Sequence, residues 1–302
     1  MTGHFDISNV ALDPIFLVLL GFGVGLLGGF FGVGGSFIAG PALFLAGLPM
    51  NFVVGTDLAH IAGKSVIAAR RHWTLGNVDV KLGLIMTAGT VAGVELGAQT
   101  IEHFKGLAEV DLAVSLAFIM IMGAISSFML CEGLMSVGRM KQERAEGLIP
   151  EEGSAFSKVA ERVQRLRWGP LISLPRSGIE QISLLAVVAV SCVGGVCSGF
   201  LGGGAGYIRM PMMVYVLGVP THVAVGTDLF EIIVSAGYGT FTHSLKGNVD
   251  VPIALIMMTG AAVGARIGAT WTQYVRGPWL RLSFVPLPVI GALMIIYKLL
   301  RH

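Results

Sequence analysis

Seven long stretches of this chain are almost free of charged residues, and they restrict its possible folds more than any other feature. They cover residues 15–48, 52–69, 82–101, 111–131, 182–218, 249–274 and 282–297. Several of them approach or exceed the roughly 20 apolar residues that an α-helix needs to cross a bilayer. Only 13% of the 302 residues are charged, against about a quarter in a soluble domain. We therefore expect an all-α polytopic membrane protein with about seven to nine membrane segments.

The chain also contains an internal duplication with an offset of 171 residues. Residues 55–86 align without gaps to residues 226–257, and 14 of the 32 positions are identical. The shared positions include Gly-Thr-Asp-Leu, His72 with His243, and Gly-Asn-Val-Asp-Val. Such self-similarity indicates a repeat architecture. We expect one transmembrane repeat in residues 1–131 and a second in residues 182–302.

Residues 132–181, between the two repeats, form a long polar region with eight Lys or Arg and seven Glu residues. We interpret it as a solvated linker containing a short amphipathic helix at 154–168, with a regulatory element as the alternative. Its basic residues place it in the cytoplasm by the positive-inside rule, and those of the 70–81 loop place that loop on the same side. The expected location is a bacterial-type inner (plasma) membrane.

A glycine-rich stretch near the start of each repeat is the main candidate for a binding site. Residues 15–48 would form a helix of about 50 Å, which is too long for one crossing and too short for two. Consecutive glycines can break a helix at membrane depth, and such a break is tolerated where it lines a cavity. A helix that restarts there directs free N–H groups at a ligand and favours an anion. The expected substrate-binding residues at the breaks are Gly32, Gly34, Gly35, Ser36, Gly202, Gly203, Gly204 and Tyr207.

These glycines allow two other interpretations. They could serve only to let helices pack closely, although packing requires spaced rather than consecutive glycines. Gly23-x-Gly25-x-x-Gly28 also matches a dinucleotide-binding pattern, but it lies inside an apolar run without the strand that such a site requires. Loop charges do not decide whether the repeats are parallel or inverted. Inverted repeats with broken helices are the commoner transporter design, and we expect them here.

Polar residues inside the apolar segments are further candidates. The pairs Thr56-Asp57 and Thr227-Asp228 recur in both repeats. Capping of the next helix is the simpler role for them, and lining the transport path is the alternative. Charged or titratable side chains are costly in lipid and are functional candidates by default. Here they are His60, Lys64, Glu95, Arg209, Glu231 and Arg266.

Specific roles follow for four of these charged residues. We expect Lys64 and Arg209 to add positive charge near the bound anion, since Arg209 directly follows the second glycine break. Glu95 and Arg266 occupy equivalent positions of the two repeats. A pseudo-two-fold axis would bring them together as an internal ion pair, which we expect to act as a structural or gating lock. We interpret the Gly-Asn of the two Gly-Asn-Val-Asp motifs as turns.

The duplicated glycine breaks, each followed by a proline, the Gly-Thr-Asp-Leu motifs and the Gly-Asn-Val-Asp motifs together resemble the TauE/SafE sulfite exporter family. This is an anion permease family of the 4-toluene sulfonate uptake permease type. The resemblance covers both repeats and leaves out the central linker. It implies transport of sulfur-containing oxyanions and organosulfonates, such as sulfite, thiosulfate and sulfoacetate, by members that differ in substrate and direction.

Residues and resemblance together predict a secondary transporter that exports a small sulfur oxyanion. One half-helix N-terminus from each repeat would hold the anion near the membrane midplane, and a proton or sodium ion is the candidate coupling ion. A passive anion channel, a sulfur-compound importer and an intramembrane enzyme are the alternatives. We do not expect the protein to be an enzyme, because the chain has no Ser/His/Asp nucleophile set and no paired Cys/His set. We also expect no cofactor, metal or nucleic-acid partner, and the sequence does not define the oligomeric state.

Overall fold

The structure is a computed structural model that describes residues 3–5, 10–106, 110–146, 157–202 and 206–301. The first half contains β1 (Gly3–Phe5), β2 (Val10–Leu12), α1 (Pro14–Phe31), α2 (Ser36–Leu45), α3 (Met50–Thr74), α4 (Val80–Gly106) and α5 (Val110–Ala145). The central part contains α6 (Ser157–Arg165), β3 (Leu171–Leu174), η1 (Pro175–Ser177) and β4 (Ile179–Ser183). The second half contains α7 (Leu184–Leu201), α8 (Gly206–Met212), η3 (Met213–Leu217), α9 (Thr221–Leu245), α10 (Val251–Trp271), η4 (Thr272–Tyr274), α11 (Gly277–Phe284) and α12 (Pro286–Leu300).

The expected all-α polytopic membrane fold is confirmed. Seven helical segments among the described residues are long and apolar enough to cross a bilayer: α1, α3, α4, α5, α7, α10 with η4, and α11 with α12. The two small hairpins, β1–β2 and β3–β4, are antiparallel and lie outside this bundle. The 25-residue α9 is also long enough to cross, but it contains Asp228 and Glu231, which lower its hydropathy.

Both glycine-rich stretches interrupt a helix. α1 ends at Phe31 because Gly32 adopts a left-handed conformation (φ 75°), and Gly35 (φ 90°) directly precedes α2. Between them the chain doubles back, since Gly35 lies against Val24 in the middle of α1. α2 therefore starts at mid-depth. In the second half α7 ends at Leu201 before Gly202 (φ 80°), and α8 begins at Gly206.

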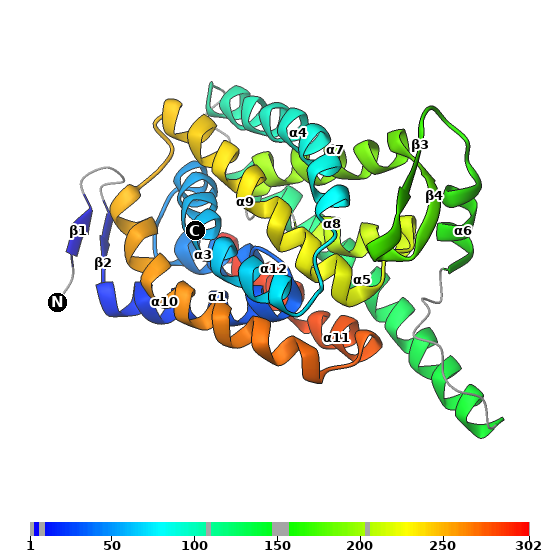
Figure 1. Cartoon of the computed structure of the whole chain (residues 1–302). Helices are drawn as coiled ribbons and strands as arrows, with labels where there is room; N and C mark the ends of the chain where they lie inside the picture. Colours follow the sequence, from blue (N-terminus) through cyan, green and yellow to red (C-terminus); the bar gives the residue numbers. More distant parts are fainter. Residues whose placement is uncertain (1–2, 6–9, 107–109, 147–156, 203–205, 302) are drawn as a thin grey trace.

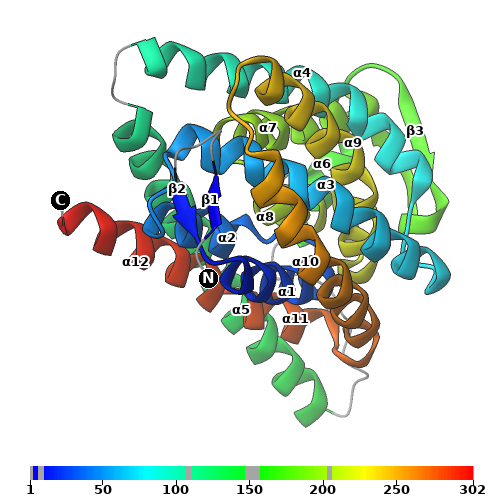
Figure 2. The same cartoon turned by 90° about the vertical axis from the view of Figure 1, so that its left-hand side faces the viewer.

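Glycines let helices from the two halves pack backbone against backbone. α1 lies beside α10 in both views (Figures 1 and 2), and the facing pairs are Gly21 with Met257, Gly25 with Ala261, and Gly29 with Ala265. α4 and α7 pack in the same way through Gly93 with Cys192 and Gly97 with Val196. Because the residue numbers rise together in both sets, each pair of helices is parallel. Gly63 with Met258 and Gly83 with Phe230 extend these groups to α3 beside α10 and α4 beside α9.

The remaining central contact, between α3 and α9, is antiparallel. Gly55, near the start of α3, meets the backbone of Asn248 just after the end of α9. Gly226, near the start of α9, meets the backbone of Asn77 just after the end of α3. Helices α1, α3 and α10 thus run one way, while α4, α7 and α9 run the other. The helices that the 171-residue offset pairs, such as α1 with α7, therefore run in opposite directions.

The α6 helix and the β3–β4 hairpin of the central linker lie against one end of the bundle, at the right of Figure 1. Lys81 donates a hydrogen bond to the Ser173 carbonyl (2.7 Å), and Arg176 donates one to the Gly76 carbonyl (2.9 Å). We call this end, where the 75–81 loop meets the β3–β4 hairpin, the linker end. The opposite end, with the 246–250 loop, is the far end. Residues 70–81, which include the end of α3 and the loop after it, therefore lie on the same side of the protein as the linker hairpin.

The linker differs from expectation at its start. We predicted it to begin at residue 132, but α5 continues to Ala145. No proline lies between Cys131 and Ala145, and Leu134 and Met135 continue the apolar character of the helix. The expected amphipathic helix at 154–168 is α6, which covers Ser157–Arg165 among the described residues.

Candidate functional site

A buried group of polar side chains lies beside the first helix break. Asp57, His60 and Lys64 extend from α3, spaced by three and four residues so that they share one helix face. The Ser36 hydroxyl, in the first residue of α2, donates a hydrogen bond to the Asp57 carboxylate. His60 Nδ1 lies 3.1 Å from Asp57 Oδ1. These four side chains are at most 1% exposed, and we call them the first cluster.

Lys64 connects the first cluster to the backbone of the break. Its ammonium group donates hydrogen bonds to the carbonyl of Gly34 and to that of Val24 (3.2 Å). The break leaves carbonyl groups without helical partners, and such groups are costly at membrane depth unless a side chain satisfies them. Lys64 therefore holds the break in place and brings positive charge to it.

The second cluster lies beside the second break and uses different residues. Arg209 on α8 forms ion pairs with Asp228 and with Glu231 (2.5 Å), both on α9, and all three side chains are 0% exposed. Asp228 is the counterpart of Asp57, but the residue that corresponds to Lys64 is Ser235. The cation thus comes from the long helix in one half and from the short helix in the other.

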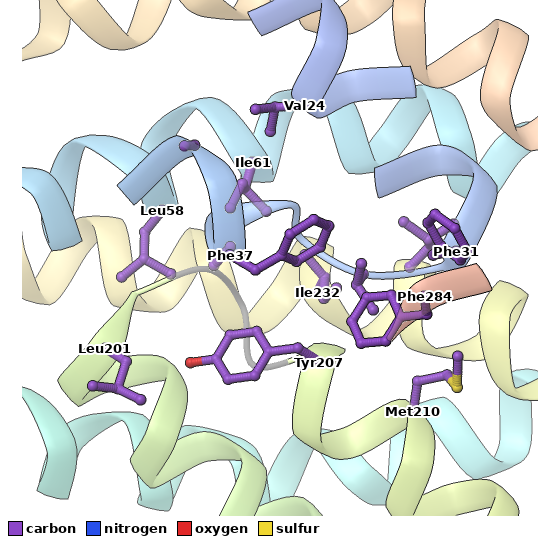
Figure 3. Close-up of a cluster of buried hydrophobic side chains, with 14 of the residues drawn as sticks. Val24, Phe31, Phe37, Leu58, Ile61, Leu201, Tyr207, Met210, Ile232 and Phe284 are labelled. Carbon is purple, nitrogen blue, oxygen red and sulfur yellow. The ribbon is translucent and has the colours of Figure 1, made fainter. Parts of the chain in front are cut away.

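The two breaks meet at the centre of the protein. A side chain on Gly206 would fall 2.8 Å from Cα of Val33 and 3.2 Å from the Gly34 nitrogen, so α8 begins directly against the first break. The next residue, Tyr207, is fully buried, and its hydroxyl has no hydrogen-bond partner in the described part of the chain. Figure 3 shows this hydroxyl directed away from Phe284. A buried hydroxyl without a partner costs about 1–3 kcal/mol.

The threonine of each Thr-Asp pair joins the two halves. The Asp250 N–H donates a hydrogen bond to Thr56 Oγ1, and the Asp79 N–H donates one to Thr227 Oγ1, each at 2.9 Å. The two bonds are equivalent under the 171-residue offset. The first lies at the far end and the second at the linker end.

The simpler role that we considered for the Thr-Asp pairs, helix capping, is wrong. Pro49 and Pro220 are the N-caps of α3 and α9, so each pair lies about two turns inside its helix. The proline fixes the start of the helix upstream of the acid. Asp79 and Asp250, in the loops before α4 and α10, do cap helices: their carboxylates accept hydrogen bonds from the N–H groups of Leu82 and Ile253. The expected turns at the two Gly-Asn pairs are confirmed, with Gly76 and Gly247 at positive φ.

The structure does not bring Glu95 and Arg266 together. Glu95, on α4, accepts hydrogen bonds from Tyr238 (3.2 Å) and Thr242 (3.4 Å) of α9. Arg266, on α10, lines a pocket beside α3. The two residues occupy equivalent positions in the two halves. Each lies against the third long helix of the opposite half, Glu95 against α9 and Arg266 against α3, so they do not pair with each other.

A third buried ionic group was not expected from the sequence. Glu132 on α5 lies 3.6 Å from Arg281 of α11, and it accepts hydrogen bonds from Tyr215 (2.7 Å) and Ser136 (2.6 Å). The available signal was the position of Glu132 and Arg281, each one residue outside an apolar segment. Of the other expected site residues, Gly203 and Gly204 lie outside the described residues.

Comparison with known proteins identifies the family of the chain. The family model for the sulfite exporter TauE/SafE matches residues 17–295. Two probable membrane transporter proteins of Bacillus subtilis are similar to the chain. YunE is 26% identical and covers 84% of this chain and 87% of its own length. YdhB is 24% identical, with coverages of 93% and 99%.

A probable membrane transporter protein of the archaeon Methanocaldococcus jannaschii is 24% identical, over 98% of this chain and all of its own length. No solved structure matches the chain significantly. The family model spans nearly the whole chain, including both glycine breaks and both buried clusters. The chain therefore belongs to the TauE/SafE sulfite exporter family of membrane transporters.

Proposed function

We propose that this protein is a secondary transporter that exports a small sulfur-containing oxyanion or organosulfonate, such as sulfite, by alternating access. The observation that carries the proposal is the meeting of the two helix breaks at mid-depth, with a buried cation beside each of them. Family membership supports an anionic sulfur compound as the substrate. Export, rather than import, follows the family description, and an importer is the alternative.

The proposed site lies between the two breaks. The N-terminal turn of α2, with Gly35 and Ser36, offers N–H groups and the positive end of the helix dipole. Tyr207, from the other half, offers a buried hydroxyl with no competing partner among the described residues. Lys64 and Arg209 supply positive charge from either side. A trigonal or tetrahedral oxyanion accepts several hydrogen bonds at once, and such converging donors match it.

The opposite directions of equivalent helices support the alternating part of the proposal. We propose that the halves are inverted repeats that rock around the fixed central site. The Thr56–Asp250 contact would then close the path at the far end, and the Thr227–Asp79 contact would close it at the linker end. The linker end would face the cytoplasm, because Arg70, Arg71, Lys81 and most linker cations lie there.

Flux measurements in proteoliposomes test this function. Purified protein would be reconstituted and the movement of radiolabelled sulfite, thiosulfate, taurine and sulfate measured, with and without a pH or sodium gradient. We expect saturable flux of at least one sulfur oxyanion that depends on a gradient. Flux of none of the four compounds would refute the proposed function. Flux that is linear in concentration would instead favour a passive channel.

A further inference from the structure

A pocket that plays no part in the proposed transport site lies at the linker end, on the outer surface between α3 and α10. It has a volume of about 430 Å³ and is lined by Val66, Ile67, Arg70, Arg71, Thr74 and Arg266. A second groove of about 410 Å³ shares Val66, Arg70 and Thr74 and continues past Phe230 and Ile233 of α9. The two grooves together form one surface with Arg70 between them.

The three arginines of this surface have no acidic partner among the described residues. Arg71 donates hydrogen bonds to Thr270 (3.1 Å) and Thr74 (3.4 Å). None of the ion pairs between described residues includes Arg70, Arg71 or Arg266. Three guanidinium groups that line one pocket repel one another. An anion bound among them would remove this repulsion.

The depth of the pocket matches the level of lipid phosphates. Arg266 lies five residues before the end of α10, about 8 Å inside it, and Arg70 lies a similar distance before the end of α3. Long basic side chains at this depth reach toward the membrane interface. Trp73 and Trp271 are half exposed at the same level, and tryptophan is enriched at the interface between lipid and water.

The internal duplication provides a comparison within the same molecule. The far-end counterparts of Ile67, Arg71 and Arg266 are Tyr238, Thr242 and Glu95. The Tyr238 and Thr242 hydroxyls both donate hydrogen bonds to Glu95. The counterpart of Arg70 is Phe241. Packing of the third helix on the neighbouring half therefore does not require arginine. The basic surface is a specific property of the linker end, which points to a ligand present on one side of the membrane.

We propose that this surface binds an anionic diacyl phospholipid of the leaflet at the linker end. The lipid phosphate would lie among Arg70, Arg71 and Arg266, as in other basic pockets between membrane helices. Its acyl chains would follow the two apolar grooves, past Val66 on one side and Phe230 on the other, toward the bilayer interior. A free oxyanion would leave these apolar walls without a partner, so we favour the lipid.

A lipid titration followed by native mass spectrometry tests the proposal. Purified full-length protein in detergent would be titrated with phosphatidylglycerol, with phosphatidylcholine of the same chain length, and with glycerol phosphate. We expect preferential binding of phosphatidylglycerol. The variant R70Q/R266Q should bind it about 30-fold more weakly, at about tenfold per 1.4 kcal/mol and about 1 kcal/mol for each basic residue.

The control is R162Q/R167Q, which removes two exposed arginines of the same end from outside the pocket. It should bind phosphatidylglycerol as the wild type does. Equal binding of the two lipids, or full binding by R70Q/R266Q, would overturn the proposal. So would tight binding of glycerol phosphate that R70Q/R266Q alone abolishes, because the pocket would then be a site for soluble anions. Circular dichroism and the melting temperature show whether each variant is folded.

Discussion

At the scale of single residues, the buried charges carry the most information. A charge at the bilayer centre costs several kcal/mol when it is unpaired. Lys64 and Arg209 avoid most of this cost because each has acceptors within the protein, backbone carbonyls for Lys64 and two carboxylates for Arg209. Replacement of such an ion pair by well-packed apolar residues often stabilises a protein. We therefore propose that both cations serve function rather than stability.

Tyr207 and Tyr215 form a matched pair for a test. The Tyr207 hydroxyl has no partner among the described residues, whereas the Tyr215 hydroxyl donates to Glu132. We expect Tyr207→Phe to leave the melting temperature unchanged or higher. The KM for the transported anion should rise about tenfold or more, because a hydrogen bond to a charged group contributes about 1.5–3 kcal/mol. Proteoliposome flux and thermal unfolding measure the two effects.

Tyr215→Phe should do the opposite. It should lower the melting temperature, because Glu132 loses a buried hydrogen bond, and leave the KM close to that of the wild type. If Tyr207→Phe destabilises the protein without a change in KM, the hydroxyl has a structural partner and is not part of the site.

Sequence reasoning could identify which residues are unusual but not which residues they contact. Lys64 and Arg209 are conspicuous because they interrupt apolar runs. Their partners depend on where the short helices α2 and α8 lie, and no local sequence pattern encodes the positions of these helices. Glu132 and Arg281 were not predicted as buried residues, because each lies at the edge of an apolar segment. A charged side chain at such a position usually faces water.

At the scale of helices, glycine has two distinct roles. Gly32 ends α1 and the consecutive Gly34-Gly35 precede α2, whereas glycines spaced by four residues pack α1 on α10 and α4 on α7. Spaced small residues are the usual means of close helix packing in membranes. The packing interpretation and the break interpretation of the sequence therefore apply to different glycines of the same stretch.

Gly23 and Gly25 of α1 allow a test of the packing role, because only Gly25 faces α10. A Cβ on Gly25 would lie 2.6 Å from Cα of Ala261, but a Cβ on Gly23 would have no neighbour within 4 Å. We expect Gly25→Ala to force α1 away from α10 and to destabilise the protein by about 1–3 kcal/mol. Gly23→Ala should leave the melting temperature unchanged or slightly higher, since alanine favours helix more than glycine does. Equal melting temperatures for the two variants would contradict the proposed packing.

The ends of the helices were harder to predict than their existence. α5 runs 14 residues beyond Cys131 because polar residues of good helix propensity continue it. Conversely, the central α9 is long enough to cross the bilayer, yet its buried acids keep its hydropathy below that of the other spans. A helix that contacts lipid must be apolar on its surface. A helix that is enclosed by other helices, such as α9, can contain buried polar residues and therefore has a lower hydropathy.

At the scale of the whole molecule, the two halves interlock through equivalent contacts. Each half supplies a Thr whose hydroxyl accepts a hydrogen bond from the loop of the other half, once at each end. The duplication itself was visible in the sequence. The direction of the second half was not, because loop charges were divided, and it follows instead from which residues face one another along α1, α3 and α4.

Isosteric variants test whether these two contacts close opposite ends. Thr56→Val should weaken the far end by about 1 kcal/mol and speed amide hydrogen exchange of the 246–250 loop. Thr227→Val should do the same for the 75–79 loop at the linker end. Exchange followed by mass spectrometry in detergent resolves the two loops. A response of both loops to either single variant would show that the ends do not open independently.

The most direct test of the central claim, that an anion site between the breaks is exposed to one side at a time, is counterflow in proteoliposomes. Vesicles loaded with unlabelled sulfite, or with whichever sulfur oxyanion gives flux, are diluted into a trace of labelled anion. Wild-type protein should accumulate label transiently above equilibrium, and folded Gly34→Leu protein should not. Label that rises to equilibrium without overshoot, or an overshoot that Gly34→Leu retains, would contradict the account.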